Sequence, residues 1–212
     1  MSGETSAATS KPLRLGFLGL GWIGRNRMAA VLDQPGIEVS ALCDAEPAAV
    51  REAQKLAPGA RVVPSFAALL EQPLDGVVIA TPSALHAEQS LAALEHGLPV
   101  FCQKPLARNA QEVERLIRCA ERRDLSLGLD LSYRNTAAVQ ELQKLVRAGA
   151  LGRIFGANLV FHNAYGPDKS WFYDPKQAGG GALMDLGIHL VDLLLWLLDF
   201  PEVTRVASQL FV

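Results

Sequence analysis

Short apolar runs alternate with helical patterns along the first 130 residues of the chain. Each run has the length of a buried strand, and the segment after it carries apolar residues at helical spacing. The expected strands are residues 13–18, 37–43, 61–63, 76–80, 100–102 and 125–129. The expected helices are residues 22–32, 46–56, 66–70, 84–95 and 110–122, and Ser65 and Asn109 are the expected N-caps of the helices that directly follow them. Such alternation builds βαβ units and predicts an α/β fold with a doubly wound parallel sheet over residues 11–130.

The pattern changes after about Ser132. A helical segment at 137–148 is followed by a long strand pattern at 152–162 and by a loop rich in glycine, proline and aromatic residues. Residues 182–198 then form an apolar helical pattern, and residues 203–212 have the pattern of another strand. We therefore expect an α+β domain to begin at residue 131 and to continue to residue 212. Residues 1–10 are small and polar and are expected to be a disordered tail.

Composition narrows the class of protein. The formal net charge is −2 and no basic cluster is interleaved with aromatic residues, so no nucleic-acid or acidic-membrane partner is expected. Residues 1–10 lack the apolar core of a secretory signal. The most apolar stretch, residues 190–198, contains Asp192 and is too short to span a bilayer. The three cysteines match no disulfide or metal pattern, which favours reduced thiols, no metal site and a cytoplasmic location.

A glycine-rich turn links the first expected strand to the first expected helix. The sequence Gly19-Leu20-Gly21-Trp22-Ile23-Gly24 matches the dinucleotide fingerprint GxGxxG in its required strand–turn–helix setting. Gly19 allows the tight turn, Gly21 lets the backbone approach a pyrophosphate, and Gly24 allows close packing of helix and strand. The helix start at Trp22 and Ile23 offers N–H groups to phosphate oxygens. The motif predicts a Rossmann-type domain that binds a nicotinamide dinucleotide.

Asp44 closes the second expected strand about 20 residues after Gly24, where the fingerprint has an acidic residue. A carboxylate at this place accepts hydrogen bonds from the ribose hydroxyls and repels the 2′-phosphate of NADP. NAD is therefore the expected cofactor, and NADP is disfavoured. Arg25 and Arg51 leave that preference open, because either cation would attract a phosphate.

Three further blocks make the pattern more specific. They are Val77-Val78-Ile79-Ala80-Thr81-Pro82 with His86, then Gln103-Lys104-Pro105, then Gly179-Gly180-Gly181-Ala182-Leu183-Met184-Asp185-Leu186-Gly187-Ile188-His189. Together with the fingerprint, they resemble the glucose-fructose oxidoreductase/inositol dehydrogenase (Gfo/Idh/MocA) family from about Leu13 to the end of the chain. The resemblance implies an NAD(P)-dependent oxidoreductase that transfers a hydride between the cofactor and a secondary alcohol of a sugar, inositol or related polyol. It also implies a second domain with a mostly antiparallel sheet, which carries the substrate site and an interface for a homo-oligomer.

The resemblance assigns residues to the site. The family's catalytic lysine, aspartate and histidine correspond to Lys104, Asp185 and His189. Segments that pass near the cofactor contain Thr81, Pro82, His86 and Gln103. Arg134 and Trp171 are further candidates for substrate contact, since sugars stack on aromatic faces. For Trp171, packing of an aromatic loop on the second domain is an equal alternative.

The catalytic assignment is chemically sensible without the family. Oxidation of a secondary alcohol needs a base for the hydroxyl proton and a cation beside the developing alkoxide. Asp185 and His189 are four residues apart on one helix face, so His189 can act as the base while Asp185 orients it or binds the substrate. Lys104 follows a strand at the carboxyl edge of the sheet and can stabilise the alkoxide. Without the glycine block, a structural Asp–His pair and a surface lysine would be the preferred interpretation.

Two features depart from the family pattern. Gln103 stands where the family's motif has glutamate, and this removes a negative charge beside Lys104. The chain is also shorter than is usual for the family, so we expect a fragment or a shortened member with an incomplete second domain and, alone, little or no dehydrogenase activity. Two other functions stay open. One is an NAD-dependent glycosidase on the same scaffold, and the other is a non-catalytic dinucleotide-binding sensor or regulatory protein.

Overall fold

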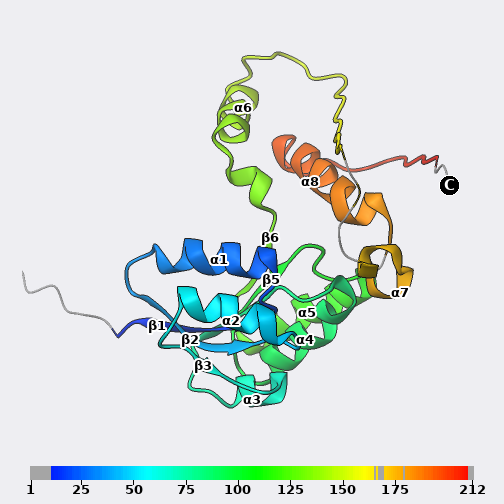
Figure 1. Cartoon of the computed structure of the whole chain (residues 1–212). Coiled ribbons are helices and arrows are strands. Elements are labelled where there is room, and N and C mark those ends of the chain that lie inside the picture. Colours follow the sequence, from blue (N-terminus) through cyan, green and yellow to red (C-terminus); the bar gives the residue numbers. More distant parts are fainter. Residues whose placement is uncertain (1–10, 165, 167–169, 179, 210–212) are drawn as a thin grey trace, which may run out of the picture.

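A six-stranded parallel sheet forms the first part of the computed structural model (Figure 1). The structure describes residues 11–209 except 165, 167–169 and 179. The strands are β1 (Leu13–Leu18), β2 (Ile37–Cys43), β3 (Arg61–Val62), β4 (Gly76–Ile79), β5 (Val100–Gln103) and β6 (Leu127–Asp130). Their order is β3-β2-β1-β4-β5-β6, which is the doubly wound arrangement. The direction of winding reverses between β1 and β4, and folds of this kind bind ligands there, outside the carboxyl ends of the strands.

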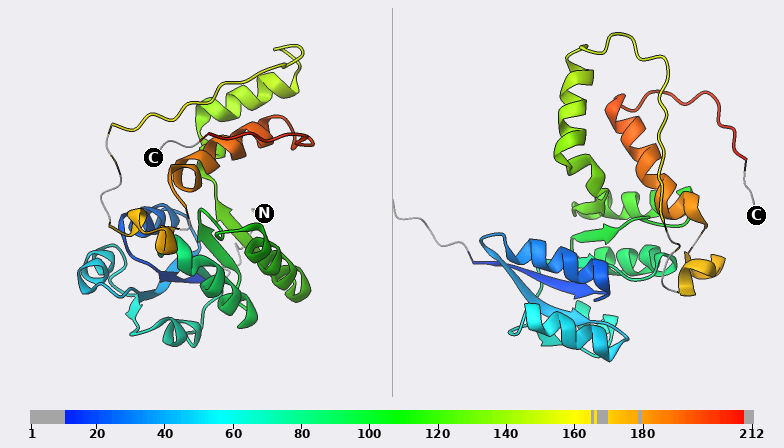
Figure 2. Two further views of the ribbon diagram at one scale, coloured as in Figure 1. Left: turned by 90° about the vertical axis from the view of Figure 1, so that its right-hand side faces the viewer. Right: turned by 45° about the horizontal axis from the view of Figure 1, so that its top comes forward.

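Helices cover both faces of this sheet (Figures 1 and 2). They are α1 (Trp22–Leu32), α2 (Pro47–Leu56), α3 (Phe66–Leu70), α4 (Ser83–Glu95) and α5 (Ala110–Arg123). Met28 of α1 and Ala53 of α2 belong to one buried apolar cluster with strand residues such as Phe17. The helices α3, α4 and α5 contribute to a second cluster on the other face, which includes Leu18. Because neighbouring strand residues point to opposite faces and both faces are buried, the strands are continuous apolar runs.

Local sequence sets the ends of these helices. The Ser65 hydroxyl accepts a hydrogen bond from the N–H of Ala68 (3.2 Å), and Oδ1 of Asn109 accepts one from the N–H of Glu112 (2.9 Å). Gly97 follows α4 with a φ of +86°, a conformation that glycine adopts without strain. The strands and helices expected before residue 131 are confirmed, with ends that differ by one or two residues.

The chain beyond β6 forms helices above the carboxyl edge of the sheet (Figures 1 and 2). A short helix η1 (Ser132–Asn135) leads into α6 (Ala137–Arg147). Two short helices follow, η2 (Ser170–Tyr173) and α7 (Pro175–Ala178). The helix expected over 182–198 is present, but its first part is a π-helical turn, η3 (Leu183–Gly187), and only α8 (Ile188–Leu197) is α-helical. Helix α8 packs against both α6 and η1.

Neither of the two strands expected in this second part is formed in the structure. Residues 152–162 carry no regular secondary structure, and neither do residues 201–209, while 210–212 lie outside the described residues. A strand needs a neighbour to satisfy its N–H and C=O groups, and neither segment pairs with another strand in the described part of the chain. The mostly antiparallel sheet is therefore not formed among the described residues. The tail expected at residues 1–10 also lies outside them.

The stretch Lys176–Leu197 is long and apolar enough to span a membrane by length and composition alone. Both of its carboxylates are ion-paired with the rest of the protein, Asp185 with Lys104 and Asp192 with Arg134. Such pairing is typical of a helix that packs on protein, because an ion pair to a neighbouring element fixes the helix against it. The stretch is therefore weak evidence for a membrane span.

Candidate active site

Lys104 and Asp185 meet at the carboxyl edge of the sheet, although they come from different halves of the chain. Lys104 follows β5, and Asp185 lies in η3, 81 residues further along the sequence. The Lys104 Nζ donates to Oδ1 of Asp185 (2.6 Å) and to the Asp185 carbonyl oxygen (2.7 Å). An ammonium group has three donors and Lys104 uses two on described residues, so one N–H is available to a ligand.

His189 lies one helical turn beyond Asp185, in α8. Its side chain is 8% exposed, and its ring packs edge-on against Tyr133 with the ring centroids 4.4 Å apart. Its Nδ1 is buried and has no hydrogen-bond partner among the described residues. Burial and the Lys104 ammonium lower the pKa of His189, and this outweighs the opposite effect of nearby carboxylates. A neutral imidazole has one acceptor nitrogen, and because Nδ1 is buried, proton transfer from a ligand would have to use Nε2.

The glycine-rich turn packs too closely for side chains at two of its glycines. Gly19 has a φ of +89°, and a Cβ there would lie 2.5 Å from the backbone of Ala80. A Cβ on Gly24 would lie 2.1 Å from the Gly19 carbonyl oxygen. Gly21 is the N-cap of α1, and no side chain of a described residue caps this helix. The N–H groups of its first turn are therefore available to an anion, beside the 68% exposed side chain of Trp22.

Asp44, which directly follows β2, is hydrogen-bonded to the same turn. Its Oδ2 accepts a hydrogen bond from the N–H of Leu20, and its Oδ1 accepts one from the N–H of Glu46 (2.8 Å). Each carboxylate oxygen keeps a further lone pair, so Asp44 can still accept hydrogen bonds from ribose hydroxyls. The Arg25 guanidinium donates to the Leu20 carbonyl (2.7 Å) and is thereby held on the turn.

His86 lies beneath the expected cofactor segment rather than on its surface. The side chain is 1% exposed, and its Nδ1 and Nε2 lie 2.7 Å and 2.8 Å from the carbonyl oxygens of Pro105 and Thr81. The ring therefore links the loop after β4, where Pro82 is the N-cap of α4, to the loop that carries Lys104. Burial lowers the pKa of His86. Any effect of His86 on a cofactor would act through these two loops.

Gln103 faces the adjacent strand. Strands β5 and β6 pair in parallel with Gln103 opposite Asp130, and Nε2 of Gln103 donates to Oδ2 of Asp130. The same oxygen accepts from Nε of Arg27, which comes from α1. Gln103 is 7% exposed and Asp130 is 6% exposed. The amide expected near the cofactor is thus part of a buried polar cluster at the edge of the sheet.

The two candidates for substrate contact are held by packing. Arg134 is ion-paired with Asp192 of α8 (Nε to Oδ2, 2.7 Å), and its guanidinium lies 6.0 Å from the ring centroid of Trp196. Trp171 stacks on Phe172 with the ring centroids 3.8 Å apart and the planes inclined by 20°. The stack joins neighbouring residues of one loop, so both alternatives for Trp171 stay open, whereas the ion pair gives Arg134 a role in fixing α8.

Sequence reasoning missed three residues of this site, namely Asp130, Tyr133 and Asp192. The sequence could have indicated Asp130, because this residue ends a strand at the same edge of the sheet as Gln103. Tyr133 follows within the next turn, and Asp192 lies three residues after His189 on the same helix. Their contacts with residues far away in the sequence could not be foreseen.

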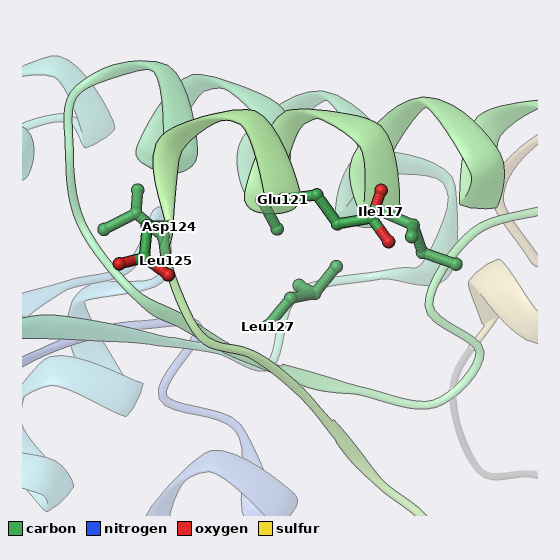
Figure 3. A pocket seen from close by; sticks show the side chains of 6 residues that line it. Ile117, Glu121, Asp124, Leu125 and Leu127 are labelled. Atoms are coloured by element: carbon green, nitrogen blue, oxygen red, sulfur yellow. The ribbon is translucent and has the colours of Figure 1, made fainter.

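A hollow lies beside the residues of α5 and the start of β6 (Figure 3). It is lined by Ile117, Ala120, Glu121, Asp124, Leu125 and Leu127. Leu127 begins β6, whereas Asp130 ends it, so the hollow is separate from the Lys104 group. Among the residues that the structure describes, no group of three or more His, Cys, Asp or Glu is arranged to hold a metal ion.

Two family models match the chain. The model described as "Oxidoreductase family, NAD-binding Rossmann fold" matches residues 13–130, and "GFO/IDH/MocA C-terminal domain" matches residues 139–211. D-glucoside 3-dehydrogenase of Escherichia coli strain K12 is 32% identical over 213 residues, which cover 97% of this chain and 60% of that protein. Inositol 2-dehydrogenase of Acidothermus cellulolyticus is 31% identical over 211 residues, which cover 95% of this chain and 59% of that protein. The chain therefore spans about three-fifths of the length of these relatives.

Solved structures with the same fold contain nicotinamide cofactors. WlbA dehydrogenase from Bordetella pertussis, in complex with NADH and UDP-GlcNAcA, has a TM-score of 0.77 at 29% identity, covering 89% of this chain and 56% of that one. Levoglucosan dehydrogenase, in complex with NADH and levoglucosan, has a TM-score of 0.76 at 27% identity, covering 88% and 54%. GenD2 from gentamicin A biosynthesis, in complex with NAD, has a TM-score of 0.82 at 24% identity, covering 91% and 55%, and shows the shared fold.

Proposed function

The chain belongs to the GFO/IDH/MocA oxidoreductase family, and we propose that it transfers a hydride between NAD and a secondary alcohol of a sugar, inositol or related polyol. The observation that carries this proposal is the contact of Lys104 with Asp185, one helical turn before His189. A cation, a carboxylate and a neutral imidazole are thereby brought together at the ligand-binding edge of the sheet. These are the groups that alcohol oxidation needs.

The residues around the glycine-rich turn suit NAD. The first turn of α1, which no side chain of a described residue caps, would offer N–H groups to the pyrophosphate, and Asp44 would offer carboxylate oxygens to the adenosine ribose. Thr81, Pro82 and Trp22 would line the cofactor at the switch point of the sheet. When bound, the nicotinamide would supply the hydride acceptor or donor, which no side chain can provide.

The protein's own residues would manage the proton and the charge on oxygen. In the direction of alcohol oxidation, His189 accepts the hydroxyl proton, because its lowered pKa keeps the ring neutral at neutral pH. The remaining N–H of Lys104 donates to the substrate oxygen and stabilises the negative charge that develops there. Asp185 fixes the Lys104 ammonium, and Tyr133 fixes the His189 ring.

We also propose a division of labour along the chain. Residues 11–130 would form the dinucleotide-binding domain, and residues 131–212 would begin the substrate domain, in accord with the match over 139–211. In an assembled substrate domain, 152–162 and 203–212 would pair as strands of an antiparallel sheet. That domain would also carry the interface of a homo-oligomer, and the protein would act in the cytoplasm.

Absorbance of NADH tests the reaction directly. The chain is incubated with NAD and a panel of polyols, sugars and nitrophenyl glycosides. We expect little or no turnover by the chain alone, and NADH formation with at least one polyol in a full-length context that completes the substrate domain. In that context, His189→Ala should lower turnover by about a hundredfold or more while NAD affinity stays nearly unchanged. The control is His96→Ala, since His96 is exposed at the end of α4.

Three outcomes would contradict the proposal. Release of nitrophenol without NADH would indicate the glycosidase, and NAD binding without any turnover in the full-length context would indicate a sensor. Normal turnover in His189→Ala would remove His189 from the role of base.

A further inference from the structure

We infer that Asp130 is a positioning residue of the Lys104 site, and that the Gln103–Asp130 pair carries the negative charge that the family's motif places at position 103. The role of Asp130 in catalysis rests on the proposed function, whereas the contact between Gln103 and Asp130 is independent of that function. It predicts that the carboxylate of Asp130 and the amide of Gln103 can be exchanged between β6 and β5 while most of the stability and the pKa of His189 are kept.

The pairing follows from strand register. Gln103 and Asp130 are direct partners at the carboxyl ends of β5 and β6, so their side chains project from the same face of the sheet. The Gln103 amide donates to Oδ2 of Asp130. Both side chains are more than nine-tenths buried, so the contact is shielded from water.

The identity of residue 103 is explained by this contact. A glutamate at position 103 would bring a second carboxylate against Asp130 in a buried place, and neither group could then donate a hydrogen bond while ionised. Glutamine has nearly the same shape and supplies the missing N–H. The carboxylate is therefore found on the neighbouring strand, at Asp130, rather than at position 103.

Arg27 holds the displaced charge in place. Its Nε donates to the same Asp130 oxygen, and Arg27 belongs to α1, the helix that follows the glycine-rich turn. Asp130 is thus hydrogen-bonded to Arg27 of α1, the helix expected to bind the cofactor, and to Gln103 of β5, the strand before Lys104. A shift of Asp130 would move both.

The charge of Asp130 also reaches His189. Three carboxylates, those of Asp185, Asp130 and Asp192, raise the pKa of His189, while burial and Lys104 lower it. Asp192 is neutralised by its ion pair with Arg134, and Asp185 by Lys104. Arg27 is the ion-pair partner of Asp130, so each of the three carboxylates that act on His189 is paired with a cation.

The test is an exchange of side chains in the full chain. The variants Gln103→Glu, Asp130→Asn and Gln103→Glu/Asp130→Asn are compared by thermal midpoint and by the NMR titration of the His189 ring, which is assigned with His189→Gln. We expect Gln103→Glu to lose a few °C in midpoint and the double variant to recover most of that loss, because the new amide at position 130 then donates to the new carboxylate at position 103. We expect Asp130→Asn to lower the pKa of His189, and the double variant to restore it in part.

Asp75→Asn is the matched control. Asp75 is ion-paired with Arg14 at the amino end of the sheet (3.0 Å), so its loss can cost stability without any change at His189. If the change in midpoint of the double variant equals the sum of the changes in Gln103→Glu and Asp130→Asn, residues 103 and 130 are not coupled and the inference is overturned. If Asp130→Asn leaves the His189 titration unchanged, Asp130 is only structural. Fluorescence titration with NADH is run in parallel, so that a failure to bind the cofactor overturns the proposed function separately from these two results.

Discussion

Asp44 has two contributions, one to the glycine-rich turn and one to a bound cofactor. In Asp44→Asn the side chain keeps its size and one oxygen acceptor, so only one of the two N–H groups, of Leu20 or Glu46, keeps its hydrogen bond. The negative charge that repels a 2′-phosphate is lost. We expect the preference for NAD over NADP to fall by about tenfold, measured as the ratio of the two dissociation constants by fluorescence titration. Glu46→Gln, on the same loop, should leave the ratio unchanged, and equal affinities in the unmodified chain would contradict the role of Asp44.

His86 makes the protein's stability depend on pH. Burial lowers its pKa from 6.5, so between 6.5 and the native value the unfolded chain binds more protons than the folded one. The unfolding free energy is therefore expected to decrease as the pH falls below 6.5 and to level off below the native pKa. His189 acts in the same direction. Denaturant titrations at several pH values between 5 and 7 give the unfolding free energy as a function of pH. We expect this free energy to change less with pH in His86→Asn, whereas His96→Asn, at an exposed position, should keep the pH dependence of the unmodified protein. An equal pH dependence of the unfolding free energy in both variants would exclude His86 as its source.

The junction of β1 and α1 is the element most sensitive to an added methyl group. In Gly24→Ala the new Cβ would lie 2.1 Å from the Gly19 carbonyl oxygen, and only movement of the helix away from the turn can relieve that clash. We expect a loss of about 1–3 kcal/mol in unfolding free energy and a weakening of NAD binding by tenfold or more. Gly59→Ala is the control, because its Cβ would meet nothing within 4 Å. Unchanged NAD affinity in Gly24→Ala would show that α1 is not the phosphate-binding helix.

Elements governed by local sequence were predictable, and those governed by distant contacts were not. The buried strands β1 to β6 and the caps at Ser65 and Asn109 follow from residues close together in the chain. The apolar pattern at 152–162 predicts a strand, but a strand exists only with a neighbour, and the pattern does not reveal whether one is present. The motif predicts Lys104, Asp185 and His189 as the catalytic group, and Lys104 and Asp185 are in contact, whereas the Gln103–Asp130 contact depends on the order of the outer strands.

The whole molecule leaves large apolar side chains in contact with water in its second half. They include Phe155, Val160, Leu183, Val191 and Val206, which are 99%, 66%, 59%, 51% and 82% exposed. Burying such side chains against another copy is favourable by roughly 1–3 kcal/mol each. We expect the 22.8 kDa chain to associate in solution, measured by size-exclusion chromatography with light scattering over a dilution series. Phe155→Ser with Val206→Ser should weaken the association, and a clean monomer at all concentrations would contradict it.

The ion pair between Lys104 and Asp185 has a consequence for the order in which the molecule folds. It joins residues 81 positions apart, and the Arg134–Asp192 pair joins residues 58 apart, whereas Gln103 and Asp130 are separated by 27. Closing a longer loop costs more chain entropy, so the sheet with its Gln103–Asp130 contact can form before the long-range pairs. The contact of Lys104 with Asp185 would then be absent from the folding transition state. Asp185→Asn should accordingly speed unfolding and leave the folding rate nearly unchanged, which stopped-flow fluorescence can resolve.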